Sequence, residues 1–134
     1  MRWQIQTSSG QPIYDQLAEQ VRRAIALGRL KAGERLPSVR QLSRELLINP
    51  NTVARAYQEL DGEGLLVSRP GLGVFVGQPR SDLTQAARKQ RLLDVLDPWL
   101  TTAVNLGFSS DAVLRMVEER VGRFQWNSPA GTET

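Results

Sequence analysis

The sequence predicts a mainly α-helical protein with one small β-hairpin. Three observations predict this class. Apolar residues recur at helical spacing through most of the chain, prolines and glycines stand at the ends of these runs, and two short β-branched and aromatic runs flank a single glycine turn. The 134 residues suit one compact domain, or a small domain with an appendage.

The first helix is predicted to begin at Gln11-Pro12 and to end at Gly28, the usual places for a helix-starting proline and a helix-ending glycine. Its apolar stripe consists of Tyr14, Leu17, Val21 and Ile25. The second helix is predicted to begin at Ser38, because Gln41 completes a capping-box pattern. The inward face of this helix carries Val39, Leu42 and Leu46, and its other side carries Arg40 and Arg44.

The third helix lies in INPNTVARAYQEL, residues 48–60, with Asn49 as its N-cap and Pro50 as its first residue. Its apolar face carries Val53, Ala56, Tyr57 and Leu60. Its opposite face begins with Asn51, Thr52 and Arg55. Only residues 47–49 separate the second and third helices, which predicts a helix-turn-helix whose second member enters the DNA major groove.

The stretch LLVSRPGLGVFV, residues 65–76, predicts two short strands around Arg69-Pro70-Gly71. Three helices followed by a hairpin are the order of a winged helix, in which the hairpin touches DNA beside the recognition helix. A phosphate-binding glycine loop is not favoured, because the third glycine of the motif is absent and strands lie on both sides.

The segment from Gln11 to Val76 resembles the DNA-binding domain of the GntR family of bacterial transcription regulators. The stretches PIYDQL, GRLKAGERLPSVRQLS, NTVARAYQEL, GLL and GLGVFV occur in family order and with family spacing. The resemblance implies a winged helix-turn-helix that binds double-stranded operator DNA as a dimer. The candidate DNA-binding residues are Ser38, Arg40, Arg44, Asn51, Thr52, Arg55, Gly71 and Gly73.

The chain departs from the family pattern in and just before the third helix. Many members carry arginine where this chain has Pro50, and another family arginine position is Ala54. Base readout is therefore expected to depend more on Arg40 and Arg55. The turn usually contains glycine where this chain has Leu47, and a left-handed leucine costs roughly 1–2 kcal/mol. This cost favours a reshaped turn.

The C-terminal part is predicted to form two helices after a linker at residues 77–82. The first apolar stripe is interrupted by Pro98, and Gly107 and Ser109 mark the turn to the second. Two such helices cannot bury their apolar faces alone, and a second copy of the chain is the simplest partner. The candidate dimerisation residues are Leu93, Leu96, Leu100, Val113, Val117, Val121 and Phe124.

The predicted domains are 11–79 for the winged helix-turn-helix, 80–126 for a short helical dimerisation domain, and 127–134 for a disordered tail. The residues after 79 are too few for the large effector domains of most GntR subfamilies. The two-helix tail instead resembles the YtrA subfamily of small dimeric repressors.

Composition argues against an enzyme and against a metal or cofactor site. The chain has no cysteine and no histidine, and no nucleophile paired with a base stands out. No apolar run approaches the ~20 residues that cross a bilayer, and the N-terminus lacks the core of a signal peptide. We therefore expect a cytoplasmic protein with no membrane partner.

The sequence predicts a sequence-specific transcriptional regulator that acts as a dimeric repressor on an inverted-repeat operator. The net charge is mildly basic, at +3, and the whole excess of Lys and Arg lies in residues 1–79. Two alternatives stay open: an architectural protein that binds DNA without sequence preference, and a winged-helix protein-interaction module. Neither the operator nor any small-molecule effector follows from the sequence.

Overall fold

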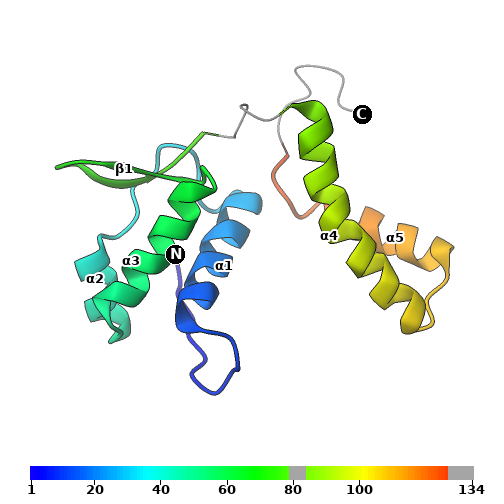
Figure 1. Cartoon of the computed structure of the whole chain (residues 1–134), viewed down its shortest axis with the longest axis horizontal. Coiled ribbons are helices and arrows are strands. Elements are labelled where there is room, and N and C mark those ends of the chain that lie inside the picture. Colours follow the sequence, from blue (N-terminus) through cyan, green and yellow to red (C-terminus); the bar gives the residue numbers. More distant parts are fainter. Residues whose placement is uncertain (79–83, 127–134) are drawn as a thin grey trace. The chain divides into compact units, whose positions relative to one another are not determined.

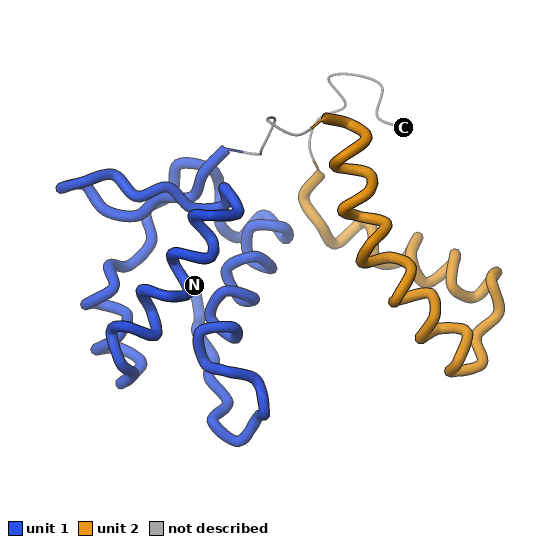
Figure 2. Tube along the Cα trace, in the orientation of Figure 1, with its two compact units in different colours: residues 1–80 blue, residues 81–134 orange. Residues whose placement is uncertain are grey.

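The computed structural model describes residues 1–78 and 84–126, so the predicted tail and much of the predicted linker lie outside the described residues. Its elements in chain order are α1 (Ile13–Ala26), α2 (Val39–Leu46), α3 (Pro50–Gly62), β1 (Leu66–Arg69), β2 (Gly73–Val76), α4 (Gln85–Asn105) and α5 (Ser110–Val121) (Figure 1). They form two compact units, residues 1–80 and residues 81–134, called unit 1 and unit 2 below (Figure 2). The mainly helical fold with one small hairpin is confirmed.

Helices α1 and α3 pack side by side at the centre of unit 1 (Figure 1). The largest fully buried side chains are Leu17, Val21, Leu42, Val53, Leu60 and Leu66. The predicted stripe of α1 supplies Leu17 and Val21 to this core, and Gly28 follows the helix with φ +76°, as a C-terminal glycine should. The Arg22 guanidinium of α1 also donates to both carboxylate oxygens of Glu63, at 2.8 and 2.5 Å.

The start of each helix in the helix-turn-helix is fixed by a side-chain cap. Ser38 Oγ accepts from the Gln41 N–H at 3.0 Å, and Gln41 Oε1 accepts from the Ser38 N–H at 2.9 Å. This reciprocal pair is the predicted capping box of α2. Asn49 Oδ1 accepts from the Asn51 N–H at 2.8 Å, and Pro50 is the first residue of α3, also as predicted.

Tyr57 ties α3 to the segment before α2. Its hydroxyl donates to the Pro37 carbonyl at 2.7 Å, and its side chain is buried. Burial disfavours the phenolate and raises the pKa of Tyr57 well above its usual range. The hydrogen bond therefore persists across ordinary pH and holds the two helices in one arrangement.

The turn between α2 and α3 keeps a left-handed residue, so the expectation of a reshaped turn is wrong. Leu47 has φ 54° and ψ 46°, and its N–H bonds to the Ser43 carbonyl. The Ile48 N–H bonds to the same carbonyl at 3.0 Å. The left-handed conformation is retained because it lets two N–H groups bond the Ser43 carbonyl at the end of α2. The Leu47 side chain is 89% exposed and therefore meets no steric obstacle.

Strands β1 and β2 are antiparallel, with Leu66 opposite Val76 and Arg69 opposite Gly73. The connector 33–36 pairs with the other edge of β2. The Leu36 N–H bonds to Val74 O at 2.8 Å, the Val76 N–H to Glu34 O at 2.8 Å, and the Gly33 N–H to Val76 O at 2.9 Å. The hairpin, called the wing below, is thus anchored along β2 by a segment that precedes the helix-turn-helix.

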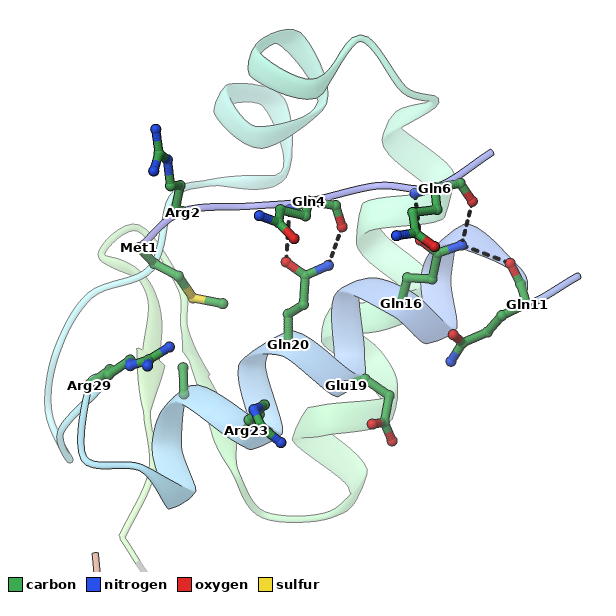
Figure 3. Close-up of a pocket in the computed structure, with 11 residues that line it drawn as sticks. Met1, Arg2, Gln4, Gln6, Gln11, Gln16, Glu19, Gln20, Arg23 and Arg29 are labelled. Carbon is green, nitrogen blue, oxygen red and sulfur yellow. Dashed lines mark hydrogen bonds between the residues drawn. The ribbon is translucent and has the colours of Figure 1, made fainter. Parts of the chain in front are cut away.

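Residues 1–6, before the predicted domain start, run along α1 and belong to unit 1 (Figure 3). The Gln16 amide bonds to both the N–H and the carbonyl of Gln6, at 2.8 and 2.9 Å. The Gln20 amide does the same with Gln4. Gln16 and Gln20 are about one helical turn apart, and this distance is close to the length of two residues of extended chain. Both pairs can therefore form together.

Unit 2 consists of α4 and α5 joined by a turn at Gly107 and Ser109. Gly107 has φ +87°, and Ser109 Oγ caps α5 by accepting from the Ala112 N–H at 3.2 Å. Helix α4 continues through Pro98, so the predicted interruption does not end the helix. In the turn that follows Pro98, the Thr102 hydroxyl donates back to the Pro98 carbonyl at 3.2 Å.

Candidate nucleic-acid interface

The first turns of α2 present three of the predicted residues. Arg40 and Arg44 are exposed and lie four positions apart, on one side of the helix. The Ser38 hydroxyl oxygen is occupied by the capping box, which leaves its hydrogen free to donate. This helix start therefore offers two guanidinium groups and one hydroxyl to an acceptor.

The first turn of α3 presents short polar side chains. Asn51 is exposed and Thr52 is half-buried, both directly behind the cap formed by Asn49. Pro50 presents no polar group, and Ala54 is half-buried and apolar. The backbone N–H groups of Asn51 and Thr52 are already bonded to Asn49, so hydrogen bonding from this part of α3 is limited to the side chains of Asn51 and Thr52.

Arg55 makes contacts inside unit 1 that the sequence did not predict. Its guanidinium carbon lies 3.7 Å from the centroid of the Tyr14 ring on α1. Its Nη2 also donates to the Tyr14 hydroxyl at 3.0 Å. A cation on an exposed aromatic face is stabilised by about 0.5–1 kcal/mol. Reading a base with Arg55 would mean giving up these contacts.

The two glycines of the wing have different surroundings. Both have positive φ, +76° at Gly71 and +124° at Gly73. A Cβ at Gly71 would meet nothing within 4 Å, whereas a Cβ at Gly73 would lie 2.9 Å from Arg35 Nε. Gly71 therefore serves the turn, and Gly73 also leaves room for Arg35. Arg35 was not among the predicted site residues, because only the pairing of the connector with β2 brings it to this position.

A cleft of about 670 Å³ lies between residues 1–6 and α1 (Figure 3). Its lining residues are mainly glutamines and arginines, among them Arg2, Arg23 and Arg29. The amides of Gln16 and Gln20 are already bound to the backbone of residues 4 and 6. None of the predicted DNA-binding residues lines this cleft.

Unit 2 exposes most of the predicted dimerisation residues. Leu96, Leu100, Val117 and Val121 are between 36% and 41% exposed, and Leu93 and Phe124 are half-buried. Val113 is 8% exposed and is used inside the unit. Further exposed apolar residues that were not on the predicted list are Leu92, Val95, Trp99, Val104, Leu106, Phe108, Leu114 and Trp126.

The part of the chain that the structure describes holds no cluster of three or more acidic side chains suited to a metal ion. Among the same residues, no helix is both long enough and apolar enough to pass through a bilayer.

Comparison with known proteins identifies the family. The family model for bacterial regulatory proteins of the gntR family matches residues 13–76. A structure titled YtrA from Sulfolobus acidocaldarius, a GntR-family transcription factor, is 30% identical over 89% of this chain and 96% of that chain, with a TM-score of 0.55. The chain belongs to the GntR family.

Two further matches differ in how much of the chain they cover. The HTH-type transcriptional repressor YtrA of Bacillus subtilis is 40% identical over 75 residues, which span 56% of this chain and 58% of YtrA. A structure titled transcriptional antiterminator from Listeria monocytogenes EGD-e covers 98% of both chains at 25% identity, with a TM-score of 0.77. This protein is thus a YtrA-like GntR regulator in which a winged helix-turn-helix precedes two C-terminal helices.

Proposed function

We propose that this GntR regulator is a homodimeric repressor that binds an inverted-repeat operator, with the start of α3 in the major groove. One observation carries the proposal. Capping places Asn51, which is exposed, and Thr52, which is half-buried, at the start of α3, and Arg40, the second residue of α2, is also exposed. Helix-turn-helix proteins use these two places to contact base edges and the DNA backbone.

Direct readout in this proposal comes from few side chains. Arg40 is an exposed guanidinium with no ion pair among the described residues, and arginine forms the commonest specific contact, to guanine. Asn51 suits adenine, and Thr52 suits either an acceptor or a thymine methyl group. Arg44 and Ser38 are assigned to phosphates, which position a protein without reading sequence. Arg55 is assigned a DNA contact that would replace its present contacts with Tyr14.

The apolar face of unit 2 supports the dimer. Val104 on α4 and Leu106 in the turn after it are 71% and 70% exposed. Burying apolar surface contributes about 25 cal/mol per Å², which favours covering this face with the same face of a second copy. A two-fold dimer would in turn present two recognition helices to two inverted half-sites. Acting on chromosomal DNA would place the protein in the cytoplasm.

The test is selection of bound DNA from a random-sequence pool by the purified full-length chain. We expect an inverted repeat to be enriched, with affinity that falls as salt rises. A pool that is retained without enrichment would identify an architectural protein. Absence of salt-dependent DNA binding would leave the protein-interaction alternative.

Repression is tested separately, with the selected operator placed across a promoter in a purified transcription reaction. We expect added protein to lower transcript yield, and a scrambled operator of equal composition serves as the control. A rise in transcript yield would make the protein an activator.

A further inference from the structure

The outer face of the wing carries a group of side chains that the proposed interface does not include. Strand residues directly opposite each other point to the same face, and so do residues two apart. Leu66 and Val76 are opposite each other and nearly fully buried, so their face of the wing packs on the core. The other face therefore carries Arg69, Gly73 and Phe75.

Arg35 joins this outer face from the connector. It pairs with Phe75 as an isolated bridge. The flanking hydrogen bonds, Leu36 N–H to Val74 O and Val76 N–H to Glu34 O, make this a non-hydrogen-bonded pair, in which side chains approach most closely. The Arg35 side chain leans from there toward Gly73. A Cβ on Gly73 would be 2.9 Å from its Nε and 3.4 Å from its Nη2.

Arg69 lies on the other side of the same stretch of β2. Its backbone is directly opposite Gly73, and its guanidinium carbon is 5.5 Å from the centroid of the Phe75 ring. Two guanidinium groups thus flank residues 73–75, one from β1 and one from the connector. Both side chains are exposed, and neither forms an ion pair with the described residues. Arg22, by contrast, is fully paired with Glu63.

Two like charges held on one small face repel each other, and an anion placed between them would offset that repulsion. The wing lies at the same end of unit 1 as the final turns of α3 (Figure 1). A phosphodiester fits these two forks, because guanidinium groups form charge-assisted hydrogen bonds with phosphate oxygens. Neither arginine belongs to the predicted interface, which assigned the wing to its glycines alone.

We propose that Arg35 and Arg69 form a two-arginine clamp for a DNA phosphate on the outer face of the wing, and that Gly73 lacks a side chain so that Arg35 can occupy its place there. The proposal rests on the proposed function, since it requires the chain to bind DNA. It adds a phosphate contact at the wing, on a face where the sequence predicted only close approach of the backbone.

The experiment measures binding of full-length Arg35→Gln, Arg69→Gln and the double variant to a short mixed-sequence duplex at several salt concentrations. Each lost phosphate contact makes the slope of log affinity against log salt shallower by about 1. Because both arginines hold the same phosphate, we expect a change of about 1 for the double variant and a smaller change for each single variant. Arg29→Gln, an exposed arginine beside the N-terminal cleft, is the matched control and should keep the slope of the unchanged chain.

Three outcomes would overturn the clamp. If the unchanged chain binds no DNA, the proposed function and the clamp fail together. If it binds with a steep slope that the arginine variants retain, the clamp alone fails. If Arg29→Gln changes the slope as much as Arg35→Gln does, the effect is one of net charge and the clamp is again rejected.

The role of Gly73 is tested by Gly73→Ala, alone and combined with Arg35→Gln. We expect Gly73→Ala to make the slope shallower by as much as Arg35→Gln does, and the combination to match Arg35→Gln alone, because both changes remove the same contact. Additive losses would mean that Gly73 does not act through Arg35. Circular dichroism of each variant establishes that the fold is retained, and Arg35→Lys, which keeps the charge, should retain most of the slope.

Discussion

The two units of the chain are built from similar amphipathic helices but bury their apolar side chains very differently. In unit 1 the three helices and the wing enclose a core in which Leu17, Leu42 and Leu60 have no exposed surface. In the described part of unit 2, Ala103 and Val113 are the buried hydrophobic residues, while Leu92 is 71% exposed. Unit 1 completes its own core, whereas the described part of unit 2 leaves many apolar side chains exposed.

Two units built from the same kind of element can differ in whether they bury their apolar side chains without a partner. Unit 1 surrounds α3 with α1, α2 and the wing, so each apolar stripe meets others. Unit 2 has two helices, and two helices can cover only the sides that face each other. This difference supports the proposal that unit 1 contacts DNA and that unit 2 joins two copies of the chain.

Removing unit 2 should have the largest effect. A chain that ends after Gln78 should be monomeric and should bind the selected operator more weakly by a factor of about 100 to 10,000, because the second half-site contact is no longer linked to the first. Analytical ultracentrifugation and operator titration measure both properties.

A point substitution separates this effect from the loss of chain length. Val117→Glu in the full-length protein places a charge in the exposed apolar face and should reproduce the monomer. The neighbouring change Glu118→Gln, on an exposed residue of the same helix, is the control and should leave the dimer intact. A truncated chain that still sediments as a dimer would contradict the assignment of unit 2.

The next largest effect compares one leucine from each unit. Leu60→Ala should lower the free energy of unfolding of unit 1 by about 2–5 kcal/mol at any protein concentration, because Leu60 is fully buried and its loss leaves a cavity. Leu100, 36% exposed, should matter mainly through the dimer. The destabilisation by Leu100→Ala should therefore shrink as the protein is diluted, since a dimer contributes stability in proportion to its population.

Thermal unfolding at two protein concentrations measures the difference between these leucines. The Leu60→Ala shift should be reproduced in the chain that ends after Gln78. If Leu100→Ala shifts the midpoint equally at both concentrations, its side chain acts inside unit 2 and the comparison between the units loses its basis.

A third test ranks the arginines of unit 1 as readers of sequence. Arg40→Ala should reduce the ratio of operator affinity to random-DNA affinity by roughly tenfold or more, since a bidentate arginine–guanine contact discriminates by about 1–3 kcal/mol. Arg55→Ala should reduce it less, because Arg55 exchanges its Tyr14 contacts for any base contact. Titration with both DNAs at one salt concentration gives the ratios.

Arg115→Ala, an exposed arginine on α5, is the control from unit 2 and should leave the ratio unchanged. A larger loss for Arg55→Ala than for Arg40→Ala would make α3 the main reader despite Tyr14. Equal falls in both affinities, with a shallower salt slope, would identify the arginine concerned as a phosphate contact.

Local signals in the sequence predicted most of the fold. The capping box at Ser38, the cap at Asn49 and the glycine after α1 depend on neighbours within a few residues, and all of them were confirmed. The hairpin followed from β-branched runs around one turn in the same way. These features need no knowledge of distant parts of the chain.

Features that depend on distant contacts did not follow from the sequence. The face of α3 on which Arg55 lies was predicted from helical spacing, but its partner Tyr14 is 41 residues away on another helix. The approach of Arg35 to Gly73 needs the connector to pair with β2, which no local pattern signals. Pro98 was predicted to interrupt the first C-terminal stripe, but α4 continues through it and tolerates the missing backbone hydrogen bond.

Leu47 gives the smallest and most specific test, because it is an exposed apolar residue in the unit that completes its own core. Leu47→Gly should raise the free energy of unfolding by about 0.5–1 kcal/mol. The glycine relieves about 1–2 kcal/mol of left-handed strain, but part of this gain is offset because glycine loses more conformational entropy on folding. Leu47→Ala keeps the strained backbone without the large side chain, and should change stability little. Both variants should remain dimers, unlike Val117→Glu. Chemical denaturation of the two variants measures the free energy of unfolding, and sedimentation measures the oligomeric state. A monomer after either change would place Leu47 in the dimer interface, and unit 1 would then not be self-contained.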